Sequence, residues 1–359
     1  PVKKDDIFPS ISLVIVAYNE EAVIGRKLEN ALSLDYPRDL LELAVISDGS
    51  TDKTNEIIHN HAEADSRLRA MISPVNQGKD ACLAQFVPEL TNDILVFSDA
   101  NSFYRKDLLR ILVKPFADAE IGFVTGSTLY KGVGADEGTT GIGLYSRLER
   151  MTKHLESLIG SCVGADGAVF AIRAGLFQMT ASDVMNDLTL PLSIVQQGYR
   201  GILEPDAACH EEEPRGIEAA FNRQVRIVNR TIRTLFRYKN LFNVFRFPLF
   251  SFQLLSHKGL KVLSPLFLSI LFISNILLLP KNHFYWLSMS VQLIFVGITC
   301  FGYISSEKFN ANPIVNMILT FVMTNIAITK AWLAFFSKDD YRRWKTTRTE
   351  SPPPSSSDD

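Results

Sequence analysis

Short apolar runs and longer amphipathic stretches alternate along the first 130 residues. The apolar runs are partly β-branched, and polar residues follow each of them. The segments between them space their apolar residues with helical periodicity. Strands alternating with helices, with polar residues at the strand ends, predict a parallel, Rossmann-like sheet. We expect strands at residues 11–17, 41–47, 69–73 and 94–98, and helices at residues 22–34, 53–64 and 80–86.

The pattern continues less regularly to about residue 237. Two further apolar runs and three further amphipathic stretches extend the α/β domain, which we place at residues 1–237. The last of these stretches is a basic amphipathic helix. We expect strands at residues 122–130 and 168–173, and helices at residues 138–157, 188–197 and 215–236.

The character of the chain changes after residue 237. Residues 238–258 alternate aromatic and basic residues, which is typical of an amphipathic segment at a membrane surface. Residues 259–337 contain three nearly uncharged apolar runs, at 260–279, 284–304 and 313–336, each close to the ~20 residues that cross a bilayer. A buried hairpin in a soluble core is the alternative, but three such runs in tandem favour about three transmembrane helices. Residues 338–359 predict a basic, then disordered tail.

The composition of the chain limits which classes of binding partner are expected. The formal net charge of −2 and a pI of about 6.4 give no electrostatic case for nucleic-acid binding, and the mean hydropathy of +0.09 is high for a soluble protein. Four scattered cysteines form no metal-binding spacing, which indicates buried thiols in a reducing compartment. The chain begins at Pro1 rather than Met, which indicates a trimmed form.

Asp99-Ala100-Asn101 follows the apolar run at residues 94–98. Open α/β sheets bind ligands at the carboxyl ends of their strands. An acid and an amide offer hard oxygens to a divalent cation, which could hold a diphosphate. The triplet therefore points to sugar-nucleotide chemistry.

Two earlier strand ends carry polar loops, Ala17-Tyr18-Asn19-Glu20-Glu21 and Asp48-Gly49-Ser50-Thr51-Asp52. The backbone of the first loop and Glu20 could face a nucleotide. An ionised Asp48 accepts hydrogen bonds only, which suits the imide of a base. Helix capping is the alternative for both loops.

These two loops, followed in order by Asn76-Gln77-Gly78-Lys79 and Asp99-Ala100-Asn101, resemble glycosyltransferase family 2 over roughly residues 9–235. That family consists of inverting enzymes of the GT-A fold that use nucleotide-diphospho-sugars. The resemblance implies a UDP-sugar donor, with Ala17, Tyr18, Glu20 and Asp48 around a uracil-type base. It also implies that Lys79 approaches the nucleotide and that Asp99 holds the diphosphate metal.

The family's usual metal triplet is Asp-x-Asp, whereas this chain has Asn101 at the third position. An amide oxygen still ligates but neutralises less charge. We expect Mg²⁺ or Mn²⁺ at Asp99 and Asn101, with His210 completing the coordination. The alternative for His210 is an ordinary surface or core histidine beside Glu211.

Inverting transfer needs a general base, because the acceptor hydroxyl loses its proton as it attacks. Asn186-Asp187 matches the position where the family carries this base, so we assign the role to Asp187; helix capping is its alternative. Gly164-Ala165-Asp166-Gly167 resembles the acceptor-side loop, which implies that Asp166 and Gly167 face the acceptor. A loop without substrate contact is the other interpretation.

Arg223-Gln224-Val225-Arg226 lies where processive members carry Gln-x-x-Arg-Trp, but this chain has no Trp there. Arg226 could still bind the departing diphosphate, since guanidinium pairs well with phosphate oxygens. The alternative is a basic stripe that faces solvent or lipid headgroups. The missing Trp argues against processive polymerisation without excluding it.

The sequence thus predicts a metal-dependent, inverting glycosyltransferase, embedded in a bacterial inner membrane or plasma membrane with its catalytic domain in the cytoplasm. Its acceptor is either a glycan, as in polysaccharide synthesis with export partners, or a polyisoprenyl-phosphate lipid carrier. A non-catalytic nucleotide-sugar-binding scaffold is a further alternative. Three spans would place Arg342, Arg343, Lys345 and Arg348 across the membrane from that domain, against the positive-inside tendency.

Overall fold

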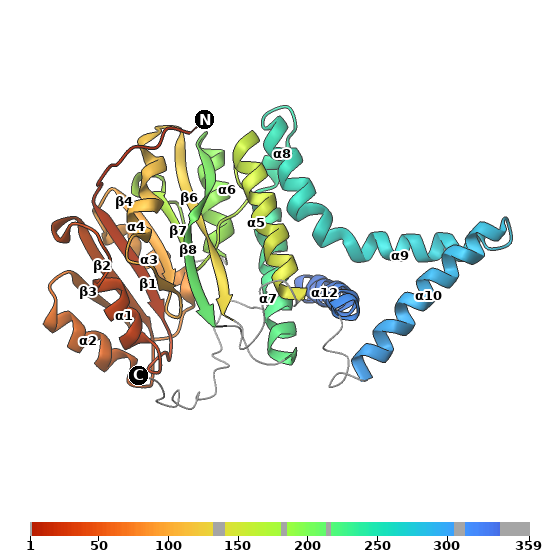
Figure 1. The fold of residues 1–359 in the computed structure, drawn as a ribbon, viewed down its shortest axis with the longest axis horizontal. Helices are drawn as coiled ribbons and strands as arrows, with labels where there is room; N and C mark the ends of the chain where they lie inside the picture. Colours follow the sequence, from red (N-terminus) through yellow and green to blue (C-terminus); the bar gives the residue numbers. More distant parts are fainter. Residues whose placement is uncertain (1, 132–140, 181–184, 213–216, 305–312, 338–359) are drawn as a thin grey trace.

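The computed structural model describes five stretches of the chain, and Figure 1 shows their arrangement. The tail expected at residues 338–359 and the first residues of two expected helices, 138–140 and 215–216, lie outside this part. The described stretches are residues 2–131, 141–180, 185–212, 217–304 and 313–337.

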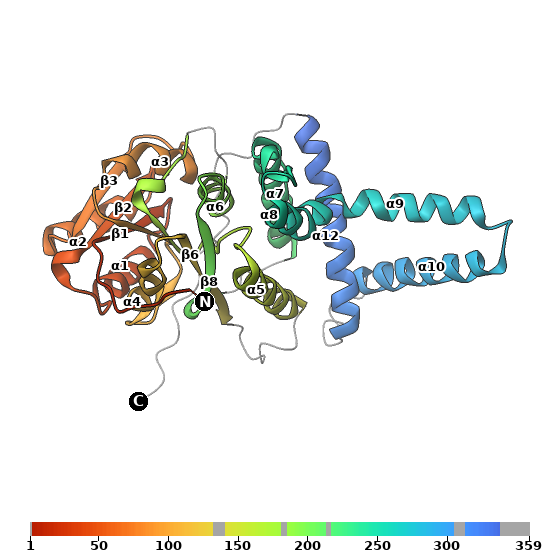
Figure 2. The same cartoon turned by 90° about the horizontal axis from the view of Figure 1, so that it is seen from above.

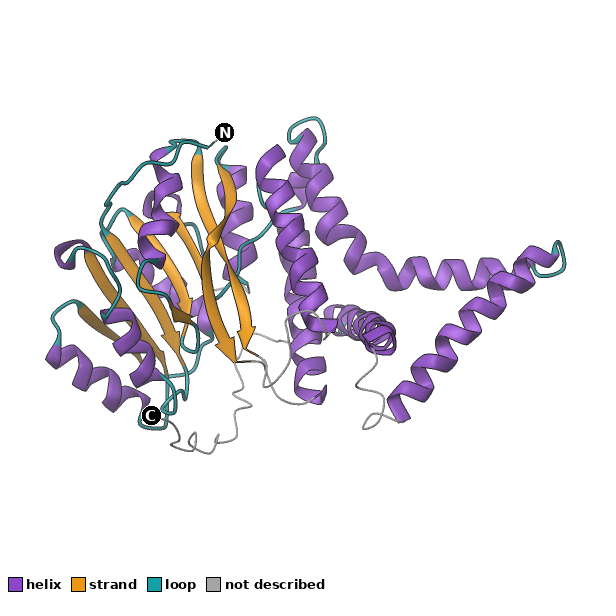
Figure 3. Cartoon of the chain, viewed as in Figure 1, coloured by secondary structure: helices purple, strands orange, loops and turns teal. Residues whose placement is uncertain are grey.

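An eight-stranded mixed sheet forms the centre of the first domain (Figure 3). Its strand order is β3-β2-β1-β4-β7-β6-β8-β5, and the first four strands in this order are parallel. β7 is antiparallel to both β4 and β6, β6 and β8 are parallel, and β5 is antiparallel to β8. The strands are β1 (Ile11–Ala17), β2 (Leu41–Asp48), β3 (Leu68–Ser73), β4 (Ile94–Asp99), β5 (Phe103–Tyr104), β6 (Ile121–Lys131), β7 (Val169–Arg173) and β8 (Arg200–Glu212).

Helices cover both faces of the sheet and create two apolar cores. One core includes residues of α1 (Ile24–Leu32), α2 (Thr54–Ala64) and α4 (Leu108–Val113). The other includes residues of α3 (Lys79–Phe86), α6 (Asn186–Gln196) and α7 (Ile217–Arg237). Alternate residues of each strand enter opposite cores, which is why strands covered on both faces are continuous apolar runs. Short 3₁₀ turns lie at Arg38–Leu40, Val87–Glu89, Lys114–Ala117 and Ala174–Leu176.

α5 (Gly141–Ile159) stands beside α7, and α7 leads along the chain to the C-terminal helices (Figure 1). A 3₁₀ turn (Lys239–Phe242) precedes α8 (Pro248–Leu254), and a π-helical segment, η6 (Leu255–Gly259), joins α8 to α9. The expected amphipathic segment is therefore not one continuous helix. Pro248 explains the break, because proline fits the first turn of a helix but not its interior.

Three C-terminal helices are long and apolar enough to cross a membrane, as the sequence predicts. α9 (Leu260–Leu278) and α10 (His283–Ile304) project away from the α/β domain, and α12 (Pro313–Phe336) lies at their base (Figure 2). These bounds differ from the expected runs by no more than one residue at each end.

The fold class is the predicted one, a Rossmann-like α/β domain followed by apolar helices. The expected positions of β1 to β4 and of the helices between them are close to those observed. β8 has no counterpart among the predicted elements, although it is the longest strand described. Its buried positions near the end are Ala207, Cys209 and Glu211, which are small or charged and give no apolar alternation.

Candidate active site

The loops after β1, β2 and β4 meet at one edge of the sheet. β1 lies between β2 and β4, with Ala17 in register with Ser47 and Val16 in register with Asp99. Parallel neighbours end at the same edge, so the polar residues that follow them lie close together. This is the edge at which the sequence predicts a nucleotide site.

The first two loops are hydrogen-bonded to each other. The Asn19 side-chain oxygen accepts a hydrogen bond from the Thr51 N–H at 2.8 Å, and the Glu20 N–H donates to the Thr54 hydroxyl at 2.8 Å. Ala17 is fully buried in a core, so only its backbone is available to a base, whereas Tyr18 is partly exposed. Glu20 is 5% exposed. These contacts hold the two loops together at the edge where the sequence predicts base binding.

Asp48 fixes the third loop. One carboxylate oxygen accepts the Gln77 N–H at 2.8 Å, and the other accepts the Gly78 N–H at 2.9 Å. The Cys82 thiol lies 3.2 Å from the first oxygen. Asp48 is fully buried, so these bonds satisfy a charge that would otherwise be costly to bury. They give Asp48 a definite structural role, and its contact with a base stays a prediction.

Gly49, next to Asp48, allows the same loops to approach closely. Its φ of +67° lies in the left-handed region, which side chains other than glycine rarely adopt. A Cβ at this position would lie 2.4 Å from the Asn76 backbone nitrogen. A glycine is therefore required here by both conformation and space.

Lys79 and Asp99 form an ion pair at the centre of the site. Lys79 lies in the first turn of α3, and its Nζ is 2.5 Å from Asp99 Oδ1. Burial opposes the positive charge of Lys79, but the Asp99 carboxylate outweighs it and raises the pKa of Lys79. Asp187 and Asp80 act in the same direction. Lys79 is thus held as a cation among three carboxylates.

The pairing of β5 with β8 brings the predicted ligand His210 toward the turn that carries Asp99 and Asn101. His210 is in register with Phe103, two residues after Asn101, and both ligand candidates are partly exposed. The set consists of a carboxylate, an amide and an imidazole, which suits Mg²⁺ or Mn²⁺ when diphosphate oxygens complete the coordination. Within the described part of the chain, no group of three or more His, Cys, Asp and Glu side chains could hold a metal by itself.

Two buried groups beneath this region are absent from the sequence-based site. Ser102 donates a hydrogen bond to Glu211, and burial together with Asp99 raises the pKa of Glu211 to about 7. Lys27 donates to the Ser98 hydroxyl at 2.7 Å and to the Ser102 carbonyl, and burial lowers its pKa to about 7. Both side chains support the turn that carries Asp99.

Asp187 is partly exposed and lies within electrostatic reach of Asp99, and its carboxylate has no hydrogen-bond donor among the residues the structure describes. It lies in the first turn of α6, but Met185 occupies the cap position and Asp187 makes no capping bond. Burial raises the pKa of Asp187, Asp99 and Asp166 add to this effect, and Lys79 and Lys153 oppose it. The capping alternative is therefore unsupported, and the carboxylate is available to a substrate.

The loop formed by residues 164–167 lies beside Asp187. The Ala165 N–H donates to the Asp187 carbonyl at 2.8 Å, and a Cβ on Gly167 would lie 3.1 Å from Asp187 Oδ2. The Asp166 carboxylate accepts the Thr128 N–H and hydroxyl, both at 2.8 Å. These bonds show how Asp166 shapes the loop, and its predicted contact with an acceptor is left as a prediction.

Asp80 anchors the start of α6. Its Oδ1 accepts the Asn186 N–H at 2.8 Å, and the Arg230 guanidinium lies 3.8 Å from its Oδ2. Burial raises the pKa of Asp80 to about 6, although Arg230 and Lys79 oppose the shift. Asp80 thus connects α3, α6 and α7, a role that no sequence motif indicated.

Arg226 lies on α7 between two arginines that face the site. The positive charge of Arg223 favours the ionised form of Glu211, and that of Arg230 favours the ionised form of Asp80. Burial and these two neighbouring arginines lower the pKa of Arg226, which has no hydrogen-bond or ion-pair partner in the described part of the chain. A partly buried cation with no partner among the described residues suits an anionic ligand.

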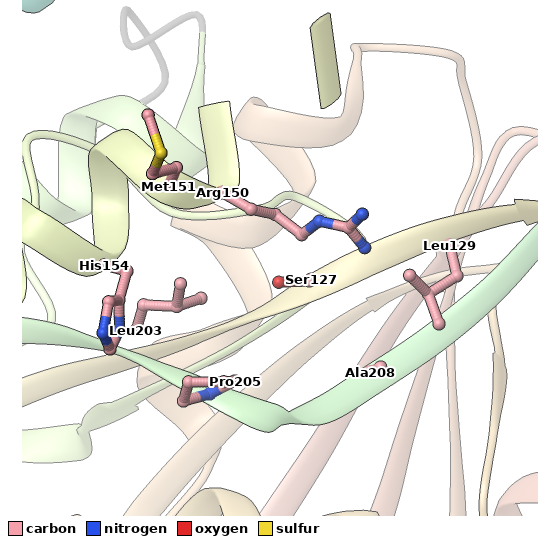
Figure 4. Close-up of a pocket in the computed structure, with 8 residues that line it drawn as sticks. All are labelled: Ser127, Leu129, Arg150, Met151, His154, Leu203, Pro205 and Ala208. Atoms are coloured by element: carbon pink, nitrogen blue, oxygen red, sulfur yellow. The ribbon is translucent and has the colours of Figure 1, made fainter. Parts of the chain in front are cut away.

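A separate cavity of about 430 Å³ lies between α5 and the strands β6 and β8 (Figure 4). Arg150, Met151 and His154 of α5 line it together with Ser127 and other residues of the sheet. None of the sequence-predicted site residues lines this cavity. The chemistry-bearing groups are instead at the strand ends.

Residues 12–176 match the family model for Glycosyl transferase family 2. A beta-monoglucosyldiacylglycerol synthase of Synechocystis sp. is 34% identical over 117 residues, 32% of this chain and 24% of that protein. A poly-beta-1,6-N-acetyl-D-glucosamine synthase of Staphylococcus aureus is 26% identical over 259 residues, 69% of this chain and 62% of the relative. The chain therefore spans less than two thirds of the length of these curated relatives.

One solved structure shares the fold over almost the whole chain. The mannosyltransferase PcManGT from Pyrobaculum calidifontis, solved with GDP-Man and Mn²⁺, superimposes with a TM-score of 0.71 at 20% identity. The match covers 94% of this chain and 90% of that one. The catalytic part has the GT-A fold that the sequence predicts.

The raised pKa of Asp80 predicts a pH-dependent stability difference between the protein and Asp80→Asn. Unfolded aspartate ionises near pH 4, whereas folded Asp80 ionises near pH 6. The protonated carboxyl therefore favours folding fully below pH 4, and this advantage is lost as the pH rises to 6, by about 3 kcal/mol. Asparagine keeps an acceptor for the Asn186 N–H but does not titrate.

Thermal unfolding from pH 4 to pH 7.5 measures the difference. We expect the unfolding temperature of the protein to fall relative to that of Asp80→Asn between pH 4 and pH 6, and the difference to stay constant above pH 6. A difference that does not vary with pH would show that Asp80 is not held protonated by burial.

Proposed function

We propose that this chain, whose residues 12–176 belong to glycosyl transferase family 2, is an inverting, membrane-bound enzyme that transfers a sugar from a UDP-sugar to a glycan acceptor. The observation that carries the proposal is the partly exposed Asp187 carboxylate, which accepts no hydrogen bond from any described residue. It lies within electrostatic reach of the Lys79–Asp99 pair. Its pKa is raised above the ordinary value of an aspartate, which is the direction that favours a general base.

The proposed reaction is a single displacement. An acceptor hydroxyl transfers its proton to the Asp187 carboxylate, and its oxygen forms a bond to the anomeric carbon. The bond from that carbon to the donor's diphosphate breaks, and the electron pair stays on the phosphate oxygen. Attack opposite to the leaving group inverts the configuration at the anomeric carbon.

The leaving diphosphate needs positive charge, which several residues would supply. Arg226 and Lys79 are the cationic side chains at the predicted diphosphate position. A divalent cation held by Asp99, Asn101 and His210 would add Lewis-acid stabilisation of the same charge. The donor set supports this assignment, and PcManGT, which shares the fold, was solved with Mn²⁺. Asp48, Tyr18 and the backbone at Ala17 would lie around the base.

A lipid acceptor is the second candidate. It is favoured by the Synechocystis relative, which is named a synthase of a glucosyl lipid, and by the apolar helices beside the catalytic domain. The Staphylococcus relative, named a polysaccharide synthase, favours the glycan acceptor. A polysaccharide product would in turn need export partners. We place the catalytic domain in the cytoplasm, where sugar nucleotides are made.

A panel of UDP-sugars, supplied to membranes that contain the protein, separates the two acceptors by product mass. A ladder or a long polymer supports the glycan acceptor, and a lipid that carries one sugar supports the lipid acceptor. Donor turnover with no transferred sugar under any condition would favour a nucleotide-sugar-binding scaffold instead.

We predict that Asp187→Asn lowers the transfer rate at least about 10³-fold and leaves donor affinity nearly unchanged, because the amide cannot accept the proton. Initial rates and isothermal titration with UDP measure the two effects. Asp206→Asn, at an exposed carboxylate outside the site, is the matched control. Full activity of Asp187→Asn would refute the assignment of the base.

Gly167→Ala tests whether the position of the Asp187 carboxylate matters. The added Cβ would lie 3.1 Å from Oδ2, so the carboxylate must move by a few tenths of an ångström. We expect the turnover number to fall about tenfold with donor affinity retained, since small misplacements of a catalytic group are costly. Gly164→Ala is the control, because its Cβ makes ordinary contacts of 3.4 and 3.5 Å. Equal rates in the two variants would contradict the proposed position.

Asp99→Ala and Asn101→Asp should have opposite effects on metal-dependent donor binding. Asp99→Ala removes the carboxylate ligand, so we expect Mn²⁺ to enhance UDP affinity at least about tenfold less than in the unmodified protein. Asn101→Asp adds a negative ligand, so we expect it to strengthen Mn²⁺ binding. UDP titrations with and without Mn²⁺ give both results. An unchanged Mn²⁺ dependence in Asp99→Ala would exclude Asp99 as a ligand.

A further inference from the structure

α12 crosses α9 steeply instead of running alongside it. The Trp332 indole N–H donates to the Val262 carbonyl at 2.8 Å, and the Ser264 hydroxyl donates to Asn325 Oδ1 at 2.7 Å. The two contacts are seven residues, or about 10 Å, apart along α12, but only two residues, or about 3 Å, apart along α9. The two helices therefore cross at a steep angle. Figure 1 shows α12 nearly end-on where α9 and α10 are seen from the side, and Figure 2 shows it lying across their base.

The C-terminal half of α12 is attached to the catalytic domain. The Asn229 side chain on α7 donates to the Ala331 carbonyl at 3.0 Å. The Arg233 guanidinium, also on α7, lies over the Phe335 ring. Ala327 and Ala331 are fully buried. α7 is the helix that carries the arginines of the active site, so α12 lies at the depth of a charged, water-facing domain.

The outer parts of α9 and α10 contact only each other within the described part of the chain. The Asn275 side chain donates to the Ser288 hydroxyl at 3.2 Å across the pair. Apolar side chains elsewhere on α9, such as Leu266 and Leu277, are 54% and 70% exposed. Exposing so much apolar surface to water is unfavourable, which assigns this hairpin to hydrocarbon. Nineteen helical residues extend about 28 Å, close to the thickness of a bilayer core.

Elements that neighbour α12 also present apolar side chains. Leu148, Met151, Leu155 and Leu158 recur every three or four residues on α5 and are at least half exposed. The end of α5 meets α8, since a Cβ on Gly160 would lie 3.0 Å from Leu249. A helix with one charged and one apolar face of this kind is typical of the membrane interface.

We infer that α12 lies in the plane of the membrane interface, between the catalytic domain and the bilayer, and that of the three apolar helices described only α9 and α10 cross the membrane, as a hairpin. The partner of this surface is the lipid leaflet on the side of the catalytic domain. The chain that follows Phe336, with Arg342, Arg343, Lys345 and Arg348, is then on the same side as that domain. This arrangement removes the conflict between three spans and the positive-inside tendency. It holds whichever sugar is transferred.

Labelling of single cysteines from one side of sealed vesicles tests this topology. In a Cys300→Ser background, Glu63→Cys reports the catalytic domain, Lys281→Cys the tip of the hairpin, and Ser351→Cys the C-terminal chain. We expect a membrane-impermeant maleimide to label Glu63→Cys and Ser351→Cys from the same side and Lys281→Cys from the opposite side. Labelling of Ser351→Cys together with Lys281→Cys, or of all three from one side, would overturn the inference.

The depth of α12 gives a second test that does not depend on the C-terminal chain. Phe321 and Phe336 are exposed, lie on neighbouring faces and are about 22 Å apart along the helix. Spin labels on Phe321→Cys and Phe336→Cys should show nearly equal immersion depths in liposomes. Labels on Leu266→Cys and Leu277→Cys of α9 should differ by about 16 Å and serve as the control. A depth difference near 20 Å on α12 would show that it crosses the bilayer.

Discussion

The ammonium group of Lys79 is the interaction on which the site depends. Asp80, Asp99 and Asp187 converge from two helices and a strand, and the cation among them offsets the mutual repulsion of their carboxylates. Lys79 reaches this position because the Asp48 carboxylate holds the two residues before it by their backbone N–H groups. The arrangement of these carboxylates therefore depends on one turn at the start of α3.

The acidic residues of the site divide into two groups by what satisfies their oxygens. Backbone N–H groups engage Asp48, Asp80 and Asp166, which hold loops and helix ends in place. Asp99 is held by a single lysine, and the Asp187 carboxylate by no hydrogen bond among the described residues. Carboxylate oxygens that the protein itself does not fully engage are the ones that can bind a metal or accept a proton. The hydrogen bonds therefore distinguish structural carboxylates from candidate functional ones more clearly than the sequence motifs do.

Sequence patterns predict the parts of this fold that depend on apolar runs. β1 to β4 and the apolar helices are predicted because their burial is carried by branched apolar residues. β8 is missed because the buried positions near its end include Cys209 and Glu211, which do not form an apolar run. The sequence therefore also misses that Glu211 and Lys27 support the turn that carries Asp99. The role of Asp80 is equally hidden, since it depends on a contact between residues 106 positions apart. For α12, length and hydropathy allow a membrane span, but only its contacts with α7 and α9 reveal its direction.

The central claim is that the Asp187 carboxylate, which accepts no hydrogen bond from the described residues, activates the acceptor for one direct displacement at the sugar. The anomeric configuration of the first product tests this most directly, because a single displacement must invert it. From a donor with an α-linked sugar, nuclear magnetic resonance of the product should show a β-linkage. An α-linked product would contradict the account, since retention requires a different role for every group placed around the anomeric carbon.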